Sequence, residues 1–201
     1  MQVEKRNMIG MDVSHHNKYF HKKVLGCWDF EIHKLSEGTT YVDPTVKEWW
    51  KTRNEDTLNG VYHYLNNSDA ESQVFNAINL LQELNMAGKV MFVIDYEDIT
   101  LEPSREKGVL KLIDFIKRFK LFYPSYQPVI YCNKTDRNAI TRWCPNDIWR
   151  NWCLWLADYS DNSVSHEDIW KPMMRQWTNK PYDLDVFFGS PSSWRTFYKL
   201  F

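Results

Sequence analysis

An apolar run in the middle of the chain ends abruptly in two carboxylates. Residues 90–94 are followed by Asp95, Tyr96 and Glu97. In a β-strand, residues two apart point to the same face, so a strand here would present Asp95 and Glu97 together and turn Tyr96 the other way. Two close carboxylates push their pKa values apart, so one can hold a proton near neutrality while the other stays charged. This pair could therefore supply a general acid beside an anionic stabiliser.

The same pattern also has a purely structural explanation. Acids at the end of a strand often cap a following helix or pair with a surface lysine, and short motifs arise by chance. However, five consecutive apolar residues indicate a strand buried on both faces, where two acids are costly unless a polar site receives them. Whether the pair is catalytic therefore depends on which other residues the fold brings beside it.

Short apolar runs alternate with amphipathic helical patterns along the chain. We expect strands over residues 8–13, 30–34, 60–65, 90–95, 128–132 and 154–157, and helices over residues 44–53, 69–86, 104–122 and 147–152. Residues 173–177 and 184–188 follow in a region poor in helix. The helix at 44–53 would have Asp43 as its N-cap. This order predicts parallel strands with right-handed crossovers, and hence an α/β fold, an irregular TIM-like (β/α)5(β)3 barrel.

Polar and aromatic residues recur where these strands end. In βα barrels the active site lies at the C-terminal ends of the strands. The residues expected at these ends are Asp12, Ser14, Lys34, Glu37, Tyr62, His63, Tyr64, Asp95, Glu97, Tyr131, Trp155, Asp158, Gln176 and Asp183. Strand ends are polar in general, so no single residue is decisive. Their recurrence on most strands predicts one acidic and aromatic cleft.

Composition narrows the classes of function. The 201 residues have a formal net charge of −1 and 43% hydrophobic residues, so we expect a folded domain and no nucleic-acid partner. No apolar run is long enough to span a membrane. The spacing of the four cysteines and six histidines fits no zinc pattern. The ten tryptophans exceed what packing needs, and aromatic faces suit sugar rings.

The organisation of the chain is simple. No internal repeat or linker interrupts it, so we expect one domain over residues 1–201, without an accessory module. The first residues contain no apolar signal-peptide core, which suggests a protein made without such a signal or with the signal removed. The cysteines Cys27, Cys132, Cys144 and Cys153 are expected to be free thiols, although a disulfide is compatible with the sequence.

Eight short segments resemble the family 25 glycoside hydrolases, the lysozymes called Chalaropsis type or N-acetylmuramidases. They are residues 10–17 (GMDVSHHN), 34–38 (KLSEG), 60–64 (GVYHY), 93–97 (VIDYE), 129–131 (VIY), 154–159 (LWLADY), 176–178 (QWT) and 183–187 (DLDVF). Each segment is weak alone, but they occur in the order of the family and extend over most of the chain. The resemblance implies an irregular barrel of five βα units followed by β-strands, the same shape that the alternation predicts.

The resemblance also implies an activity and a site. The activity would be hydrolysis of the β-1,4 bond between N-acetylmuramic acid and N-acetylglucosamine in bacterial cell-wall peptidoglycan, and neither a metal nor a cofactor is implied. We expect the protein to be a monomer without a separate wall-binding module. Glu97 would be the general acid and Asp95 its partner, with Asp12 and Asp183 completing an acidic floor. The sugar subsites would be lined by Lys34, Glu37, Tyr62, Tyr64, Tyr131, Trp155 and Gln176. Asp95 could attack the sugar directly, orient the 2-acetamido group of the substrate as nucleophile, or stand opposite an attacking water.

Two features depart from the family pattern. The family usually has Asn two residues after the aspartate of the last motif, where this chain has Asp185. Asp183 and Asp185 would share a strand face, and alignment favours Asp183 as the one in the site. The connection over residues 178–183 is short, which puts nearby subsite contacts in doubt. His15 and His16 are expected at the surface or behind the site, and Asp158 either joins the cleft or caps the segment beyond it.

Two other classes of function compete with a muramidase. One is a glycan-binding or phage structural protein with a lysozyme-like fold and weak or no activity. Its weakness is that a decayed enzyme usually loses an acid, and the acidic set here is complete. The other is a hydrolase of another N-acetylated polysaccharide. The setting suggested by the sequence is that of a phage endolysin, a phage tail lysin or an exported bacterial enzyme acting on the cell wall.

Overall fold

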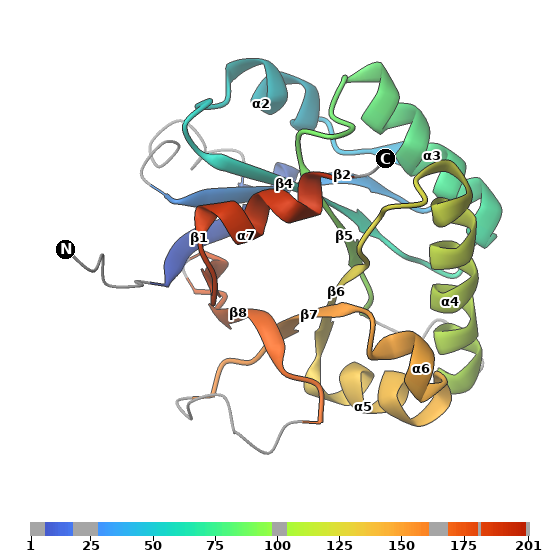
Figure 1. The fold of residues 1–201 in the computed structure, drawn as a ribbon. Coiled ribbons are helices and arrows are strands. Elements are labelled where there is room, and N and C mark those ends of the chain that lie inside the picture. Colours follow the sequence, from blue (N-terminus) through green and yellow to red (C-terminus); the bar gives the residue numbers. More distant parts are fainter. Residues whose placement is uncertain (1–6, 18–27, 98–103, 161–168, 181, 200–201) are drawn as a thin grey trace.

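A closed barrel forms the centre of the protein (Figure 1). The computed structural model describes residues 7–17, 28–97, 104–160, 169–180 and 182–199. The barrel strands are β1 Met8–Val13, β2 Phe30–Glu37, β4 Leu58–Tyr64, β5 Met91–Asp95, β6 Val129–Asn133, β7 Cys153–Ala157, β8 Pro172–Thr178 and β9 Leu184–Phe187. They are hydrogen-bonded in the order β1-β9-β8-β7-β6-β5-β4-β2, and a β1–β2 pairing closes the ring. The predicted barrel is therefore confirmed.

The strands from β1 and β2 round to β8 run parallel, whereas β9 runs antiparallel to both β8 and β1. The short β3, Tyr41–Val42, adds to the edge of β2. The helices are α2 Val46–Thr52, α3 Ala70–Glu83, α4 Arg105–Phe122, α5 Lys134–Trp143, α6 Asn146–Trp149 and α7 Pro191–Arg195, with 3-10 turns η1 His15–Asn17 and η3 Thr196–Tyr198. No helix in these ranges is long and apolar enough to cross a membrane.

Alternation along each strand divides the apolar residues into two cores. On β5, Phe92 and Ile94 pack outward against α3 and α4, where Phe92 stacks on Phe119 with ring centroids 4.5 Å apart. Val93 points into the barrel, where it belongs to a second cluster with residues of β1, β2 and β6 to β9. Because side chains alternate, Asp95 follows Val93 into the barrel and Tyr96 returns to the outer core.

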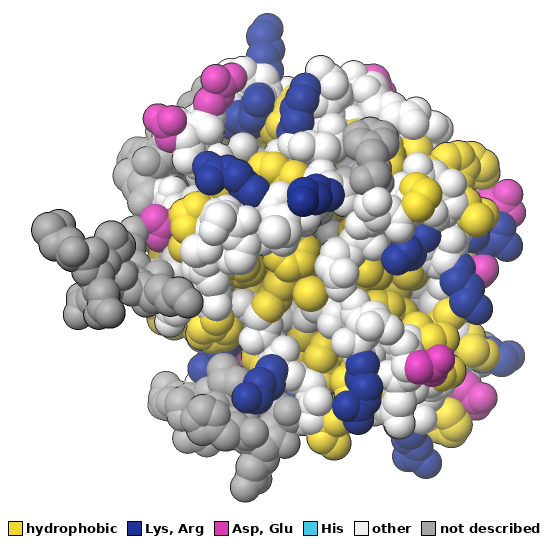
Figure 2. All heavy atoms as spheres, in the orientation of Figure 1, with side chains coloured by type: hydrophobic (Ala, Val, Ile, Leu, Met, Phe, Trp, Pro, Cys, Tyr) yellow, Lys and Arg dark blue, Asp and Glu magenta, His cyan; other side chains and the backbone are white. Residues whose placement is uncertain are grey.

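The C-terminal helix α7 plugs one end of this barrel. Trp194 is fully buried, and its ring lies 4.5 Å from that of Phe30 and 5.2 Å from that of Phe187, measured between centroids. Gly10 leaves room for Phe30, because a Cβ at this position would lie 2.4 Å from the Phe30 ring. Figure 2 shows the face that carries α7, with lysine and arginine side chains spread over it around apolar surface.

One predicted helix needs correction, and two helices were missed. The helix predicted over 44–53 begins at Val46, and Asp43 is buried before it, accepting hydrogen bonds from Thr45 N and Oγ1. The helices α5 and α7 were not expected from the pattern. The buried side of α5 consists of Asp136, Ala139 and Ile140 alone, which is too small an apolar stripe to be recognised.

Trp194→Ala should destabilise the protein by about 3–5 kcal/mol, because it removes a fully buried aromatic ring and leaves a cavity at the barrel end. Trp177→Ala is the matched control, since Trp177 is 45% exposed and should cost less than about 1 kcal/mol. Urea unfolding followed by circular dichroism measures both. Equal losses in the two variants would show that α7 does not close the barrel as a packed plug.

Candidate active site

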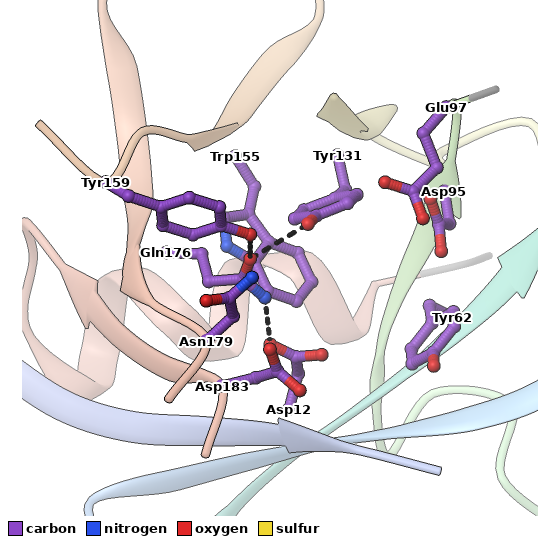
Figure 3. A pocket seen from close by; sticks show the side chains of 10 residues that line it. All are labelled: Asp12, Tyr62, Asp95, Glu97, Tyr131, Trp155, Tyr159, Gln176, Asn179 and Asp183. Carbon is purple, nitrogen blue, oxygen red and sulfur yellow. Dashed lines mark hydrogen bonds between the residues drawn. The ribbon is translucent and has the colours of Figure 1, made fainter. Parts of the chain in front are cut away.

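A cavity of about 330 Å³ opens at the C-terminal ends of the barrel strands (Figure 3). Its lining residues come from β1, β4, β5, β6, β7, β8 and the segments after them. They are Asp12, Tyr62, Asp95, Glu97, Tyr131, Trp155, Tyr159, Gln176, Asn179 and Asp183. All four acids predicted as catalytic therefore meet in one cavity, together with four of the seven residues predicted to bind sugar.

The acid pair lies on one wall of the cavity. Asp95 is the last residue of β5 and is 7% exposed, whereas Glu97, two residues further, is half-buried. Tyr96 between them is buried in the outer core. In Figure 3 the carboxyl groups of Asp95 and Glu97 lie next to each other, across the cavity from Asp12 and Asp183. The predicted alternation is confirmed, and it continues from the end of β5 at Asp95 to Glu97, two residues beyond the strand.

Burial dominates the electrostatics of these acids. Desolvation raises the pKa of Asp95 well above its usual range, and the charges of Glu97 and Asp12 raise it further. The positive charge of Lys34 opposes this shift. Desolvation and the charge of Asp183 raise the pKa of Asp12 to about 8. The pKa of Asp183 rises to about 6 through its own burial. The site therefore holds protons near neutrality, which a general acid requires.

Gln176 connects the residues of the opposite wall through hydrogen bonds. The hydroxyls of Tyr131 and Tyr159 donate to its Oε1 over 2.9 and 2.5 Å. With its carbonyl oxygen engaged in this way, Nε2 faces Asp12 and donates to Asp12 Oδ2 over 2.6 Å. Figure 3 shows the amide between the two tyrosine hydroxyls and Asp12. Gln176 thus contacts an acid directly and fixes the orientation of that acid.

Asp183, just before β9, and Asp185, within β9, take different positions. Asp183 lines the cavity, and its carbonyl accepts from Asp12 N over 3.3 Å. Asp185 is fully buried behind the cavity wall, where its Oδ1 accepts from Trp155 Nε1 over 2.9 Å. Burial and the charge of Asp12 raise the pKa of Asp185 well above its usual range. The structure therefore places Asp183, the residue favoured by alignment, at the cavity surface.

Three predicted sugar-binding residues lie outside this cavity. Lys34 and Glu37 line a second cavity of about 420 Å³ at the ends of β2 and β4, and their Nζ and Oε2 atoms are 2.6 Å apart. Tyr64 stands beside them, with its ring centroid 5.0 Å from Lys34 Nζ. A bulge between Lys34 and Ser36 shifts the register of β2 and allows Lys34 and Glu37 to meet. The local pattern did not predict this bulge.

Four other polar residues expected near the strand ends lie outside the acid cavity. His15 and His16 line the second cavity, so they lie beside the acid cavity and not within it. Asp158 accepts from Ser160 N and Oγ and pairs with Lys134 at 3.0 Å, which makes it a cap of the following segment. His63 is fully buried on the outer side of β4, bonded to Ser36 and Gln73.

Sequence reasoning gave no role to two lining residues, Tyr159 and Asn179. Tyr159 closes the segment LWLADY, and its place two residues beyond Ala157 could have drawn attention to it. Asn179 lies in the connection between β8 and β9, where no periodic pattern operates. Within the described parts of the chain, no group of three or more His, Cys, Asp or Glu residues is arranged to hold a metal ion. There Cys132, Cys144 and Cys153 are free thiols, and Cys27 lies outside the described residues.

The raised pKa of Asp12 makes stability depend on pH. Between about pH 4 and pH 8 the unfolded chain has lost this proton while the folded protein keeps it, so the free energy of unfolding falls as the pH rises. Asp12→Asn removes this titration and should raise the melting temperature relative to wild type more at pH 8 than at pH 4. Each kcal/mol gained corresponds to about 2–4 °C.

Thermal unfolding of both proteins at the two pH values measures this difference. Asp56→Asn, at an exposed turn, is the control for the loss of an aspartate in general. A constant difference between Asp12→Asn and wild type across the pH range would contradict a raised pKa at Asp12.

The comparisons with known proteins agree with this geometry. The model of the family described as glycosyl hydrolases family 25 matches residues 11–186. No curated protein sequence matches the chain.

Among solved structures, the bacterial lysozyme from Streptomyces coelicolor is similar with a TM-score of 0.75 and 18% identity, covering 98% of this chain and 99% of that chain. A family GH25 lysozyme from Aspergillus fumigatus gives 0.74 and 22%, covering 96% and 100%. The modular autolysin LytC from Streptococcus pneumoniae, in complex with a synthetic peptidoglycan ligand, gives 0.69 and 20%, covering 90% of this chain and 47% of that one. These structures share the fold, and the family match identifies the chain as a member of glycosyl hydrolases family 25 and hence as a glycoside hydrolase.

Proposed function

We propose that this protein is a peptidoglycan muramidase, which hydrolyses the β-1,4 bond between N-acetylmuramic acid and N-acetylglucosamine. The observation that carries the proposal is the placement of Asp95 and Glu97 side by side in a cavity with two further acids and aromatic walls. Glycoside hydrolysis requires one protonated carboxyl group and one carboxylate at the scissile bond. The lysozymes with the same fold, and the autolysin solved with a peptidoglycan ligand, support this choice of polymer.

Glu97 is the proton donor in this proposal. It is the less buried acid of the pair, so it can reach the glycosidic oxygen of a bound chain. Burial and the charge of Glu97 raise the pKa of Asp95, and this coupling favours a proton shared by the two carboxyl groups. As the glycosidic bond breaks, this proton passes from Glu97 to the leaving oxygen.

Asp95 stabilises the positive charge that develops on the sugar. Once the shared proton has left, Asp95 and Glu97 carry more negative charge. This negative charge faces the oxocarbenium-like centre of the sugar. Oδ1 of Asp95 is buried and has no hydrogen-bond partner within the described residues, so nothing there offsets the cost of charging this carboxyl group before a substrate binds. Tyr62, Tyr131 and Trp155 supply aromatic surface around this position.

Glu97→Gln should leave the fold intact and lower muramidase activity by about 100- to 10,000-fold, because the amide keeps the shape of the side chain but cannot donate the proton. The measurement is release of new reducing ends from purified peptidoglycan, with mass analysis of the products. Glu48→Gln, at an exposed position on α2, is the matched control.

The same assay separates the competing functions. Full activity of Glu97→Gln would contradict the assigned acid. Absence of products from peptidoglycan with the wild-type protein would favour a binding or structural role. Cleavage of chitin in preference to peptidoglycan would identify another N-acetylated polymer as the substrate.

Gln176→Glu should lower kcat by roughly 10- to 100-fold, with a smaller change in KM, because it replaces the donor to Asp12 by a second carboxyl group. The new acid keeps an acceptor for Tyr131 and Tyr159 but repels Asp12 or shares its proton. The pH profile of kcat should therefore be displaced as well. Gln82→Glu on the exposed side of α3 is the control, and an unchanged pH profile in Gln176→Glu would contradict the role of the amide.

A further inference from the structure

The second cavity lies at the same edge of the barrel as the acids, beside the acid cavity. Its volume is about 420 Å³, against about 330 Å³ for the acid cavity. Its walls come from the turn after β1, the end of β2 with the following turn, and the segment after β4. They consist of His15, His16, Lys34, Glu37, Gly38, Thr39, Thr40, Tyr41, Asn66 and Ser68. Among these residues, the charge of Lys34 acts on the pKa of Asp95, but none of them lines the acid cavity, so the second cavity needs a separate explanation.

The turn that forms one wall is held firmly from behind. Asn76 of α3 donates from Nδ2 to Gly38 O over 3.0 Å and to Tyr41 O over 3.2 Å. Gly38 has a φ of 54° and approaches Asn66 so closely that a Cβ would lie 2.4 Å from Asn66 Nδ2. The wall is therefore formed before any ligand arrives, which reduces the cost of ordering on binding.

His15 is also fixed. Its Nδ1 lies 3.0 Å from Oδ2 of the fully buried Asp43 and 3.0 Å from the hydroxyl of Tyr41. A carboxylate acceptor requires the proton on Nδ1, so Nε2 is the ring nitrogen left for a ligand. The buried carboxylate of Asp43 thus holds the partly exposed imidazole of His15 in one orientation, which suits contact between Nε2 and a ligand.

The lining carries charges of both signs. Lys34 is 9% exposed, and its ammonium group lies 5.5 Å from the ring centroid of Tyr41 and 5.0 Å from that of Tyr64. Glu37 forms an ion pair with Lys34 and remains partly exposed. Hydroxyls and amides complete the walls. Aromatic surface for sugar faces belongs mainly to the acid cavity, where Tyr62, Tyr131, Trp155 and Tyr159 gather.

The two cavities are close enough to hold one substrate. Glu37 pairs in register with Tyr64, and Tyr64 pairs with Asp95, so the second cavity begins two strands away from the catalytic pair. Neighbouring strands are about 4.8 Å apart, so two steps correspond to roughly 10 Å. A substituent of the sugar that occupies the acid cavity can reach this distance.

We propose that the second cavity binds the peptide stem that muramic acid carries on its lactyl group. This inference rests on the proposed muramidase function. A peptide stem presents amides, carboxylates and an ammonium group, which match a polar cavity with Lys34, His15 and Glu37. A plain N-acetylglucosamine polymer has no charged group for these residues. The cavity thus makes the enzyme select glycan strands that carry peptides.

The test compares glycan strands that carry uncrosslinked peptide stems with the same strands after an amidase has removed the peptides. Wild type should cleave the peptide-bearing strands with a kcat/KM about 10-fold higher or more. Thr40→Trp, at the exposed rim of the cavity, should fill it and reduce this preference to about 1 by loss of activity on peptide-bearing strands. Thr52→Trp, exposed on α2, is the matched control and should keep the preference.

Equal cleavage of both strands by wild type, or an equal loss on both in Thr40→Trp, would overturn the proposal and assign the cavity to solvent or to a sugar. No cleavage of either strand by wild type would instead contradict the muramidase function.

A second measurement does not depend on the variant. A synthetic N-lactoyl stem peptide added to wild type should shift the NMR amide signals of Thr39, Thr40 and Asn66, and unshifted signals at saturating peptide would overturn the proposal.

Discussion

Closure of the barrel by β9 is the constraint on which the site depends. This strand runs antiparallel between β8 and β1, and it joins the last part of the chain to the first. The bond from Asp12 N to Asp183 O crosses that seam directly. Without the closure, Asp12 would face an open sheet edge and Gln176 would lose the carboxyl group that it orients. The helix after β9 then seals the opposite end with Trp194, so the acids have access to solvent from one side.

The same closure creates an electrostatic cost. Asp95 and Asp185 are buried and Asp12 is half-buried near them, and desolvation raises the pKa of each. Hydrogen bonds from Gln176 to Asp12 and from Trp155 to Asp185 offset part of the cost. Protonation offsets the rest, because a neutral carboxyl is far easier to bury than a carboxylate. The protein thereby gives up stability at neutral pH and gains acids that hold their protons, a common exchange at active sites.

Local patterns predicted the parts of the fold that rest on local physics. The alternation through Val93, Asp95 and Glu97 located the acid pair correctly, because a buried strand fixes which face each side chain takes. The order of strands and helices predicted the barrel for a similar reason, since parallel strands need crossovers. The helix α5 escaped prediction because its buried stripe is small and partly polar.

Features created by tertiary contacts were not accessible in this way. The bulge in β2 after Lys34 changes the phase of the strand, so Glu37 joins Lys34 in the second cavity and not the acids. The distinction between Asp183 and Asp185 depends on which one packs under Trp155, which a two-residue spacing cannot reveal. Asn76 supports a turn that lies far from it in the sequence, and a single polar residue on a helix gives no sign of this contact.

The second cavity owes its shape to a buried network that does not titrate with the acids. Gln73 donates to the carbonyls of Asn66 and Ser68 and accepts from Asn66 N, so it holds the wall that follows β4. His63 supports Gln73 from the outer face of β4, and burial lowers its pKa to about 4. The imidazole is therefore neutral over the range in which Asp183 and Asp12 change charge, with pKa values of about 6 and 8. The acids of the first cavity can thus gain and lose protons while the cavity beside them keeps its shape.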